Sequence, residues 1–296
     1  MRKTFFVIVL IALLCATSVT GQAEEGEEEQ KNGSTRISTS VSVASVSQSD
    51  IRGFDASYAL KKYSAELEWL FLFLNADHLN YDWDSDTSFL GVSDQDPWSS
   101  LSRIAPGAQY YRRFGGKWGI WARMEAISGF EERPTWRSWT YNPQLIGIYS
   151  PTEHLSLYCG AGILDNPTER VVYPVLGVAW NNDADRGLAF SLGFPETMAR
   201  YRFNQRLALR LDFQWEIQYH RLSGENDLAS KGYLRTKTKQ PSLHLSYSPV
   251  GDLILDLGVT RYLGRSLSVY DRQGNKLASR DVSDSWGLSL GLEYTF

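Results

Sequence analysis

The chain has few cysteines, no long apolar run and no basic stretch. Only two of its 296 residues are cysteine, Cys15 and Cys159, and loss of an N-terminal leader would leave Cys159 alone. A single cysteine excludes an internal disulfide, and Cys159 lies in an apolar alternating pattern where it acts as a small hydrophobe. Beyond the leader no apolar run reaches the roughly 18 residues of a membrane-spanning helix. Nothing in the distribution of Lys and Arg indicates a nucleic-acid partner.

The first residues have the order of a secretory signal peptide. Arg2 and Lys3 precede the apolar run Phe5–Leu14, and small residues follow as far as Ala23. This apolar run is about ten residues long, too short to span a bilayer as a helix. Leu14, directly before Cys15, disfavours a lipoprotein signal. We therefore predict a signal peptide over residues 1–23, with cleavage after Gly21 as the alternative, and an exported protein.

An acidic segment follows the predicted cleavage site. Without Arg2 and Lys3 the chain keeps 28 basic and 34 acidic residues, a net charge of −6, and five of the acids lie within Glu24–Glu29. Such a charged run, continued by the polar residues to Thr35, is typical of a disordered, solvated segment. We predict a disordered lead-in over residues 24–35, and a partner-binding tail is the alternative.

The rest of the chain alternates between apolar and polar residues. In "RLALRLDFQWEIQYH" every odd position from Leu207 to Tyr219 is apolar, and most even positions are polar or charged. Because strand side chains point alternately to opposite faces, each such segment is a ribbon with one apolar and one polar face. Similar patterns occur in "SAELEWLFLF", where Phe73 is expected on the apolar face, and in "KWGIWARMEA", "HLSLYCGAGI" and "DLILDLGV".

The length of these patterns distinguishes a membrane barrel from a soluble β-sandwich. Sandwich strands are commonly about five or six residues long, whereas several patterns here continue for about a dozen residues, as tilted membrane-crossing strands do. Aromatic residues make up 13% of the chain, and many of them lie at the ends of patterns, as girdle aromatics at membrane interfaces would. Examples are Trp118, Trp139, Tyr149, Trp180, Tyr219, Tyr247 and Tyr294. The predicted fold is an all-β, transmembrane, antiparallel up-and-down β-barrel.

The expected connections alternate between short turns and longer, more polar loops. Short turns are expected at Lys61–Lys62, Gly115–Gly116, Ser150–Glu153, Asn181–Arg186, Asn204–Gln205 and Ser248–Gly251. Longer loops are expected at Asp77–Ser99, Phe130–Trp136, Leu164–Arg170, Arg221–Gly232 and Leu263–Ser283, with tighter links at Gln48–Arg52 and Pro195–Met198. This layout predicts about 14 strands, with about 12 as the fallback, and places short turns in the periplasm and longer loops outside the cell.

The last strand carries the features of an assembly signal. One parity of "SDSWGLSLGLEYTF" is wholly apolar and ends on the final residue of the chain. This strand resembles the C-terminal signal by which the barrel-assembly machinery recognises its clients, which implies that machinery and periplasmic chaperones as partners. The residues of this face are Trp286, Leu288, Leu290, Leu292, Tyr294 and Phe296.

The C-terminal third has a more specific likeness. The segments "LGFPETMARYRFNQRLALRLDFQWEIQYHRL" and "YLRTKTKQPSLHLSYSPVGDLILDLGVTRY" resemble a family of uncharacterised bacterial outer-membrane β-barrel proteins. The matching features are the corner at 193–196, the long strand that ends at Tyr219 and the turn at 247–249. The resemblance is best over the C-terminal hundred residues and implies a barrel in the outer membrane of a Gram-negative bacterium. It implies no known chemistry and no cofactor.

Strand parity predicts which charged residues line the lumen. They are Glu66, Glu68, Arg123, Glu125, Arg210, Asp212, Glu216, Asp256 and Glu293, a set of mixed sign. Charges inside a barrel must be paired or hydrated, so they either brace a filled barrel or line a wet channel and set its selectivity. The sequence favours a passive, porin-like channel for small solutes, and a non-conducting structural or surface-interaction barrel is the alternative.

Two patterns raise the question of chemistry. His244 and Ser246 share a strand face, as do His154 and Ser156, and a His-x-Ser pair resembles the catalytic pair of lipid A deacylases. Both pairs lie beside expected periplasmic turns, whereas lipid A is in the outer leaflet, so we expect polar lumen residues and keep a lipid-modifying hydrolase as a remote alternative. The acidic stretches "SDQD" and "DWDSD" would hold calcium only weakly. We predict neither an enzyme nor a metal site.

One strand is longer than the membrane requires. A strand tilted by about 40° crosses an apolar band about 25 Å tall in about ten residues. Counted back from Ser248, "YLRTKTKQPSLHLSY" leaves that band near Lys239, so Arg235, Lys237 and Lys239 should face outward at the outer interface. Cations at this height are expected to contact lipopolysaccharide phosphates, and solvated charges are the alternative.

Overall fold

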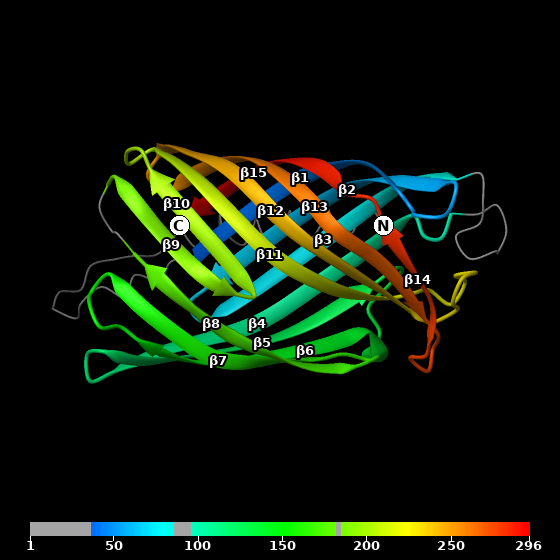
Figure 1. The fold of residues 1–296 in the computed structure, drawn as a ribbon, viewed down its shortest axis with the longest axis horizontal. Helices are drawn as coiled ribbons and strands as arrows, with labels where there is room; N and C mark the ends of the chain where they lie inside the picture. The colour runs from blue at the N-terminus through cyan, green and yellow to red at the C-terminus, as the bar shows by residue number, and fades with distance from the viewer. Residues whose placement is uncertain (1–36, 86–95, 182–184) are drawn as a thin grey trace, which may run out of the picture.

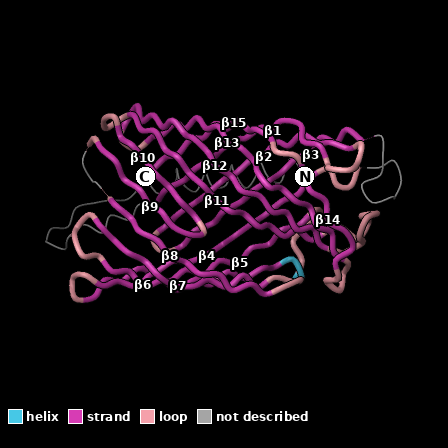
Figure 2. Tube along the Cα trace, in the orientation of Figure 1, coloured by secondary structure: helices cyan, strands magenta, loops and turns pink. Residues whose placement is uncertain are grey.

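The computed structural model describes residues 37–85, 96–181 and 185–296, and in it the chain forms a closed antiparallel barrel of 14 strands (Figure 1). The predicted all-β barrel and its strand number are confirmed, and the count of 12 is wrong. The predicted signal peptide (1–23) and acidic lead-in (24–35) lie outside the described residues. Figure 2 shows how completely strands make up the fold, with one short helical turn, η1 (Trp136–Ser138).

The wall strands follow one another around the ring in chain order. They are β1 (Ile37–Asp50), β2 (Ala56–Trp69), β3 (Leu72–Ser85), β4 (Ser100–Phe114), β5 (Trp118–Phe130), β6 (Trp139–Tyr149), β7 (Leu155–Asp165), β8 (Arg170–Trp180), β9 (Gly187–Phe194), β10 (Glu196–Arg202), β11 (Leu207–Arg221), β12 (Tyr233–Val250), β13 (Leu253–Tyr270) and β15 (Ser285–Thr295). The remaining strand, β14 (Lys276–Val282), pairs with the far end of β13, outside the ring.

The ring closes between its first and last strands. β1 pairs with β15 from Ser38 opposite Thr295 to Val46 opposite Gly287, and the amide of Phe296 donates to the carbonyl of Ile37 at 2.8 Å. The two ends of the described barrel therefore lie side by side. We call the end that holds them the short-turn end and the opposite one the long-loop end.

Two expected connections are wrong. The chain turns at Leu70–Phe71, so Lys61–Lys62 lies inside β2 and not in a turn. Side-chain parity reverses across this turn, and Phe73 is buried inside the barrel at 5% exposure instead of facing outward. β3 continues to Ser85, so the expected loop Asp77–Ser99 begins nine residues too early. Alternation hid this turn because the apolar residues run from Trp69 to Leu74 without a break.

The strands near the long-loop end also exceed the expected lengths. β12 and β13 have 18 residues each, and β14 occupies part of the segment Leu263–Ser283 that was expected to be a loop. These strands project beyond the membrane, where water replaces lipid around the outer face. The sequence predicts the long β12, but it counts the outer part of β13 and all of β14 as loop because the alternation weakens after Leu263.

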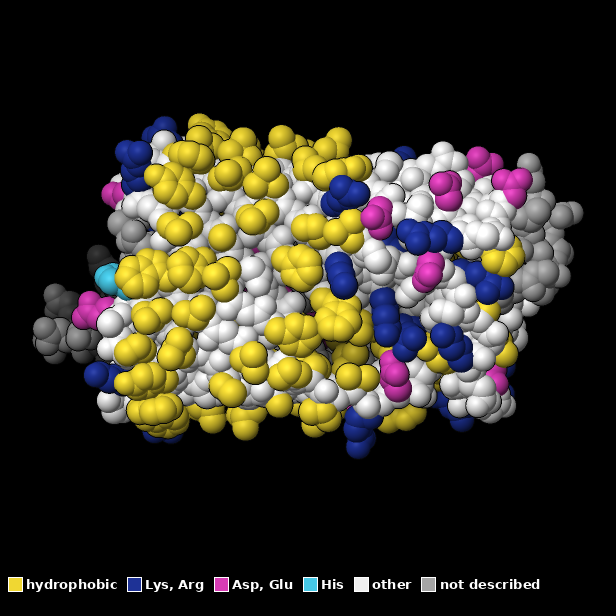
Figure 3. All heavy atoms as spheres, in the orientation of Figure 1, with side chains coloured by type: hydrophobic (Ala, Val, Ile, Leu, Met, Phe, Trp, Pro, Cys, Tyr) yellow, Lys and Arg dark blue, Asp and Glu magenta, His cyan; other side chains and the backbone are white. Residues whose placement is uncertain are grey.

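A wide apolar belt surrounds the short-turn half of the barrel. Figure 3 shows hydrophobic side chains covering this half, while charged side chains gather on the other half. Leu211 is 55% exposed, Leu257 57% and Leu288 63% on this surface. Exposed leucines in such a continuous band mark the surface that lipid covers. Within the described residues, no helix is long and apolar enough to cross a membrane.

The interior of the long-loop half is packed like a soluble protein. Its buried apolar cluster contains Val46, Ile51, Ala56, Tyr58, Leu60, Leu79, Trp98, Leu101, Leu222, Ala229, Leu234, Leu267, Val269 and Val282. Loop residues join this cluster, and Asn226 Nδ2 donates to the carbonyl of Pro97 at 2.7 Å, which ties two loops together. The barrel is therefore filled at this end.

The wall is incomplete beside β9 and β10. These strands have only eight and seven residues, and β8 pairs with β9 only from Leu176 to Trp180. Beyond their turn at Pro195, β11 approaches β5 instead: Arg221 lies opposite Phe130, and the amide of Glu131 donates to the carbonyl of Arg221 at 3.0 Å. The weak sequence pattern of the two short strands thus corresponds to a real shortening of the wall.

Candidate functional site

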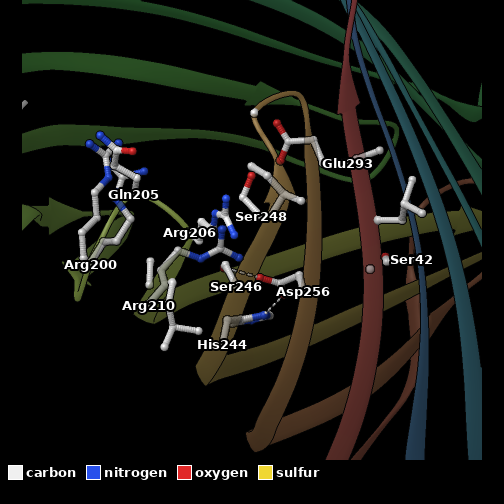
Figure 4. Close-up of a pocket in the computed structure, with 18 of the residues that line it drawn as sticks. Ser42, Arg200, Gln205, Arg206, Arg210, His244, Ser246, Ser248, Asp256 and Glu293 are labelled. Carbon is white, nitrogen blue, oxygen red and sulfur yellow. Dashed lines mark hydrogen bonds and ion pairs between the residues drawn. The ribbon is translucent and has the colours of Figure 1, made fainter. Parts of the chain in front are cut away.

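A cavity of about 680 Å³ occupies the short-turn half of the barrel interior (Figure 4). Its lining comes from β10 and β11 on one side, from β12 and β13, and from β15, β1 and β2 on the other. Turn residues such as Asn204, Gln205 and Gly251 belong to this lining and are exposed, so the cavity reaches the rim of the barrel. We call it the vestibule.

One wall of the vestibule is basic. Arg200 on β10 and Arg210 on β11 are directly opposite each other in the strand register and both line the cavity, as do Arg202 and Arg206. Like charges directly opposite on neighbouring strands repel. Arg210 Nε donates to Asp212 at 2.7 Å, whereas Arg200 forms no ion pair within the described residues and its buried Nε lacks a hydrogen-bond partner.

The other wall is acidic. Glu66 on β2 and Glu293 on β15 both lie beside Ser40 of β1 in the strand register, so the two carboxylates flank one strand. Glu293 accepts a long hydrogen bond of 3.5 Å from Ser38 Oγ. Neither glutamate forms an ion pair with any described residue. Glu68 is exposed nearer the rim and lies outside the vestibule lining.

Asp256 holds His244 and Ser246 at the side of the vestibule (Figure 4). The Ser246 hydroxyl donates to Asp256 Oδ2 at 2.7 Å, and His244 Nδ1 contacts Oδ1. A serine nucleophile needs a direct hydrogen bond to its histidine base. Here the carboxylate contacts both residues, and His244 Nε2 lies 3.9 Å from Asp212. This geometry braces the wall and lacks the base–nucleophile contact of a hydrolase.

In the second His-x-Ser pair, too, the histidine and the serine contact other residues and not each other. His154 lies in the turn before β7, where its Nδ1 contacts the carbonyl of Asn181 at 3.0 Å and its ring lies 5.6 Å from that of Trp180. Ser156 contacts Ser150 at 2.8 Å instead. Of the acidic stretches, Asp86 and Ser93–Gln95 are outside the described residues, and no group of three His, Cys, Asp or Glu within the described ranges could hold a metal ion.

A dense charge network lies beyond the vestibule in the middle of the barrel. Asp77 Oδ1 lies 3.4 Å from Lys62 Nζ, and its Oδ2 is 3.0 Å from Arg103 Nη1. Arg103 continues to Glu125 at 3.5 Å, and Arg123 contacts the same carboxylate at 3.8 Å. These buried charges are paired across β2 to β5, which is the arrangement that burial of charge requires.

Glu216 lies between two small cavities beyond this network. It accepts hydrogen bonds from the side chains of Gln218 and Gln240. It lines one cavity of about 60 Å³ with Tyr58 and Lys62, and another of about 50 Å³ with Arg103 and Tyr219. Farther out, Tyr81 and Trp83 pack on Tyr58, and Trp98 packs edge-on against both of them. This aromatic cluster closes the interior toward the long-loop end.

The predicted outward-facing residues are the three cations of β12 and the apolar face of β15. Arg235 Nη1 donates to Glu169 at 2.7 Å, and Tyr219 donates to the same carboxylate, so neither is a free interface residue. Tyr219 is buried at 7% exposure, which makes its assignment to the aromatic girdle wrong. Lys239 is exposed and Lys237 half-buried. On β15, Trp286 to Leu292 face outward, and the rings of Tyr294 and Phe296 meet at 4.6 Å.

Sequence reasoning missed several residues of the interior. Lys62 and Asp77 were hidden by the misplaced turn and loop, and Arg103 by the uneven alternation of β4. Arg200 and Arg202 had a usable signal, because Tyr201 and Phe203 beside them are exposed on the outer surface and the strand alternates. The tertiary structure brings Arg210, Asp256, Glu66 and Glu293 to one cavity and Arg123 and Glu125 to the deeper network.

Three solved structures illustrate what the fold resembles. An outer membrane channel from Pseudomonas putida F1 is 13% identical over 93% of this chain and 100% of that one, with a TM-score of 0.43. The P. putida toluene transporter TodX is 10% identical over 90% and 91%, with a TM-score of 0.38. The KdgM porin in complex with disordered oligogalacturonate is 13% identical over 87% and 99%, with a TM-score of 0.34.

No protein-family model and no curated protein matches the sequence. The resemblance to a family of uncharacterised outer-membrane barrels therefore stays a prediction. The likeness to these solved structures concerns the fold: this chain is similar in architecture to bacterial outer-membrane barrels.

Proposed function

We propose that this protein is a passive outer-membrane channel for small, water-soluble solutes. The observation that carries the proposal is the vestibule, a charged cavity of about 680 Å³ inside a belt of exposed apolar residues. Unpaired charges at membrane depth are stable only where water reaches them. At about 30 Å³ per water molecule, the vestibule has room for about twenty water molecules or more.

The belt and the two unequal ends support a location in the bacterial outer membrane. In such barrels the short turns and both termini face the periplasm, and the longer loops face outward. We assign the short-turn end to the periplasm on this basis. Export through the signal peptide at residues 1–23 and insertion by the barrel-assembly machinery are parts of the same proposal.

The packed long-loop half means that this conformation is closed. Trp98 is 2% exposed among Tyr81, Trp83 and the other residues of the apolar cluster, and it lies in the connection between β3 and β4. Passage through the outer end requires that Trp98 and the aromatic residues packed against it move aside. The same packing favours the second candidate, a non-conducting structural or surface-interaction barrel.

Single-channel conductance in planar bilayers distinguishes the channel from the non-conducting structural barrel. The channel predicts discrete conductance steps from correctly folded protein, and Trp98→Ala should lengthen the openings by loosening the packed end. Trp136→Ala is the matched control, because Trp136 lies in η1, in the connection between β5 and β6 at the same end, but is 87% exposed. Complete absence of steps from folded wild-type and Trp98→Ala protein would leave the structural barrel.

A further inference from the structure

The charges of the vestibule are separated by sign. Four arginines line it from β10, β11 and the turn between them: Arg200, Arg202, Arg206 and Arg210. The acids of the lining are Asp185, Glu66, Asp256 and Glu293, so the formal charges balance. Asp185 lies just before Gly187, the register partner of Arg202, and Asp256 lies on β13, so Glu66 and Glu293 alone form the acidic wall. Figure 4 shows the arginines on one side and Glu293 projecting from the strand on the other.

Neither sign is neutralised by the opposite wall. Arg200 has no ion pair among the described residues, and Glu66 and Glu293 have none either, whereas nearly every charge of the deeper network is paired. The one carboxylate that contacts the basic wall, Asp212, comes from Arg210's own strand. Two unpaired clusters of opposite sign across a water-filled space create a field from one wall to the other.

The spacing suits a ligand that bridges the two walls. β11 and β15 are three strands apart in the ring, through β12 and β13. At about 4.8 Å per strand, their backbones are separated by about 14 Å along the sheet. Arg206 directly precedes β11 and Arg210 lies on it, whereas Arg200 on β10 and Glu66 on β2 lie farther around the ring, six strands apart. The cavity of about 680 Å³ that these residues share with Glu293 is of the size that holds a small molecule.

We propose that the vestibule binds small zwitterionic solutes, with a carboxylate at Arg200 and Arg206 and an ammonium group at Glu66 and Glu293. Guanidinium groups pair with carboxylates through charge-assisted hydrogen bonds, and Arg200 has no ion pair with any described residue. A solute with both charges satisfies both walls, whereas an anion or a cation satisfies one and is repelled by the other. Transport of these solutes rests on the proposed channel function, but their binding in the vestibule does not.

The probe is 6-aminohexanoate, which carries its two charges at opposite ends of an aliphatic chain, compared with hexanoate and hexylammonium. Isothermal titration calorimetry on detergent-solubilised protein at low salt measures binding without any need for conduction. The zwitterion should bind at least about fivefold more tightly than either singly charged analogue, because only it engages both walls.

Two substitutions assign the ends of the ligand. Arg200→Gln should weaken binding of 6-aminohexanoate and of hexanoate by about five- to tenfold. Glu293→Gln should weaken the binding of 6-aminohexanoate to a similar extent. It should leave the binding of hexanoate unchanged or make it tighter. Arg112→Gln is the matched control, since Arg112 is an exposed arginine at the same end of the barrel that lies over Phe114 and does not line the vestibule.

The outcomes separate this proposal from the channel. Equal binding of zwitterion and hexanoate, or no effect of either substitution in the vestibule, overturns the zwitterion site. Binding with the predicted specificity in a protein that never conducts upholds the site and removes the channel. The Arg200 variant should fold, because the change relieves repulsion from Arg210, and heat-modifiable gel migration verifies this.

Discussion

Lys62 and Asp77 form an ion pair at 3.4 Å between neighbouring strands in the middle of the barrel, and Arg103 approaches the other carboxylate oxygen at 3.0 Å. Ser64 adds a hydrogen bond of 2.7 Å to Asp77. One carboxylate thus compensates two buried cations. These ion pairs link the interior faces of three neighbouring strands, because Lys62 is on β2, Asp77 on β3 and Arg103 on β4.

Removal of that carboxylate should destabilise the barrel. Asp77→Asn removes the one ion-pair partner of Lys62 among the described residues and leaves Arg103 with Glu125 alone. Loss of one partner of a buried pair costs about 3–5 kcal/mol. The free energy of unfolding in urea, measured in lipid vesicles, should fall by that amount. Lys61→Met on the exposed face of the same strand is the control and should change it little. A similar stability for both variants would mean that the network is hydrated and weak.

The two faces of β11 should respond differently to a new arginine. Leu211 is 55% exposed in the apolar belt, where Leu211→Arg costs about 2–4 kcal/mol near the bilayer midplane. Gln214 has the opposite parity and lies opposite Glu196 in the register, so Gln214→Arg gains a carboxylate neighbour. Refolding into vesicles, followed by heat-modifiable gel migration, reports the folded fraction. Equal damage from both substitutions would contradict the assignment of the faces.

The C-terminal residue should matter for assembly more than for stability. Phe296 is 38% exposed, contacts Tyr294 and donates its amide to Ile37 where the ring closes. If the barrel-assembly machinery reads this residue, Phe296→Glu should lower the amount of barrel in the outer membrane and increase periplasmic degradation. Phe203→Glu, a change of an exposed phenylalanine at the same end of another strand, is the control. Equal surface levels of both variants would argue against a terminal signal.

Acid should release the loop between β7 and β8. Partial burial alone would raise the pKa of Glu169, but hydrogen bonds from Tyr219 and Arg235 outweigh it and hold the pKa below its usual range. A depressed folded pKa means that the contribution is complete above the unfolded value of about 4.3 and is lost as the pH falls through the folded value. The protection factors for amide hydrogen exchange at Asn166, Thr168 and Glu169 should therefore fall below about pH 4. In Glu169→Gln these protection factors should be low already at neutral pH and should no longer change with pH.

Lipopolysaccharide contact at the outer interface is a further prediction. Figure 3 shows Lys and Arg side chains gathered beyond the belt on the side of the long-loop end. Arg235 is already paired with Glu169, so Lys237 and Lys239 should carry most of the contact with lipid phosphates. Changing Arg235, Lys237 and Lys239 to Gln should lower the lipopolysaccharide that copurifies with folded barrel. The same change at Arg112, Arg113 and Lys117, three exposed cations of the opposite end, should leave it unaltered.

The sequence by itself determined the barrel, because two-residue alternation is a property of each strand alone. Leu209 and Leu211 share one face of β11, and Arg210 and Asp212 share the other, because strand side chains alternate. An apolar face then meets lipid and a charged face lines the interior. The strand count also followed from alternation, although the turn before β3 was misplaced by nine residues. That turn has no glycine, proline or polar residue to mark it, and only pairing of Trp69 with Leu72 defines it.

Only the tertiary structure decided what lies inside the barrel. Glu66 and Glu293 are 227 positions apart in the chain, yet they flank one strand because closure of the ring places β15 beside β1. Parity gives the face of a residue but not its height or its neighbours around the ring. Whether two charges pair, oppose each other or remain unpaired depends on strand register and ring order. Those features separate the basic and acidic walls of the vestibule and bury Lys62 against Asp77.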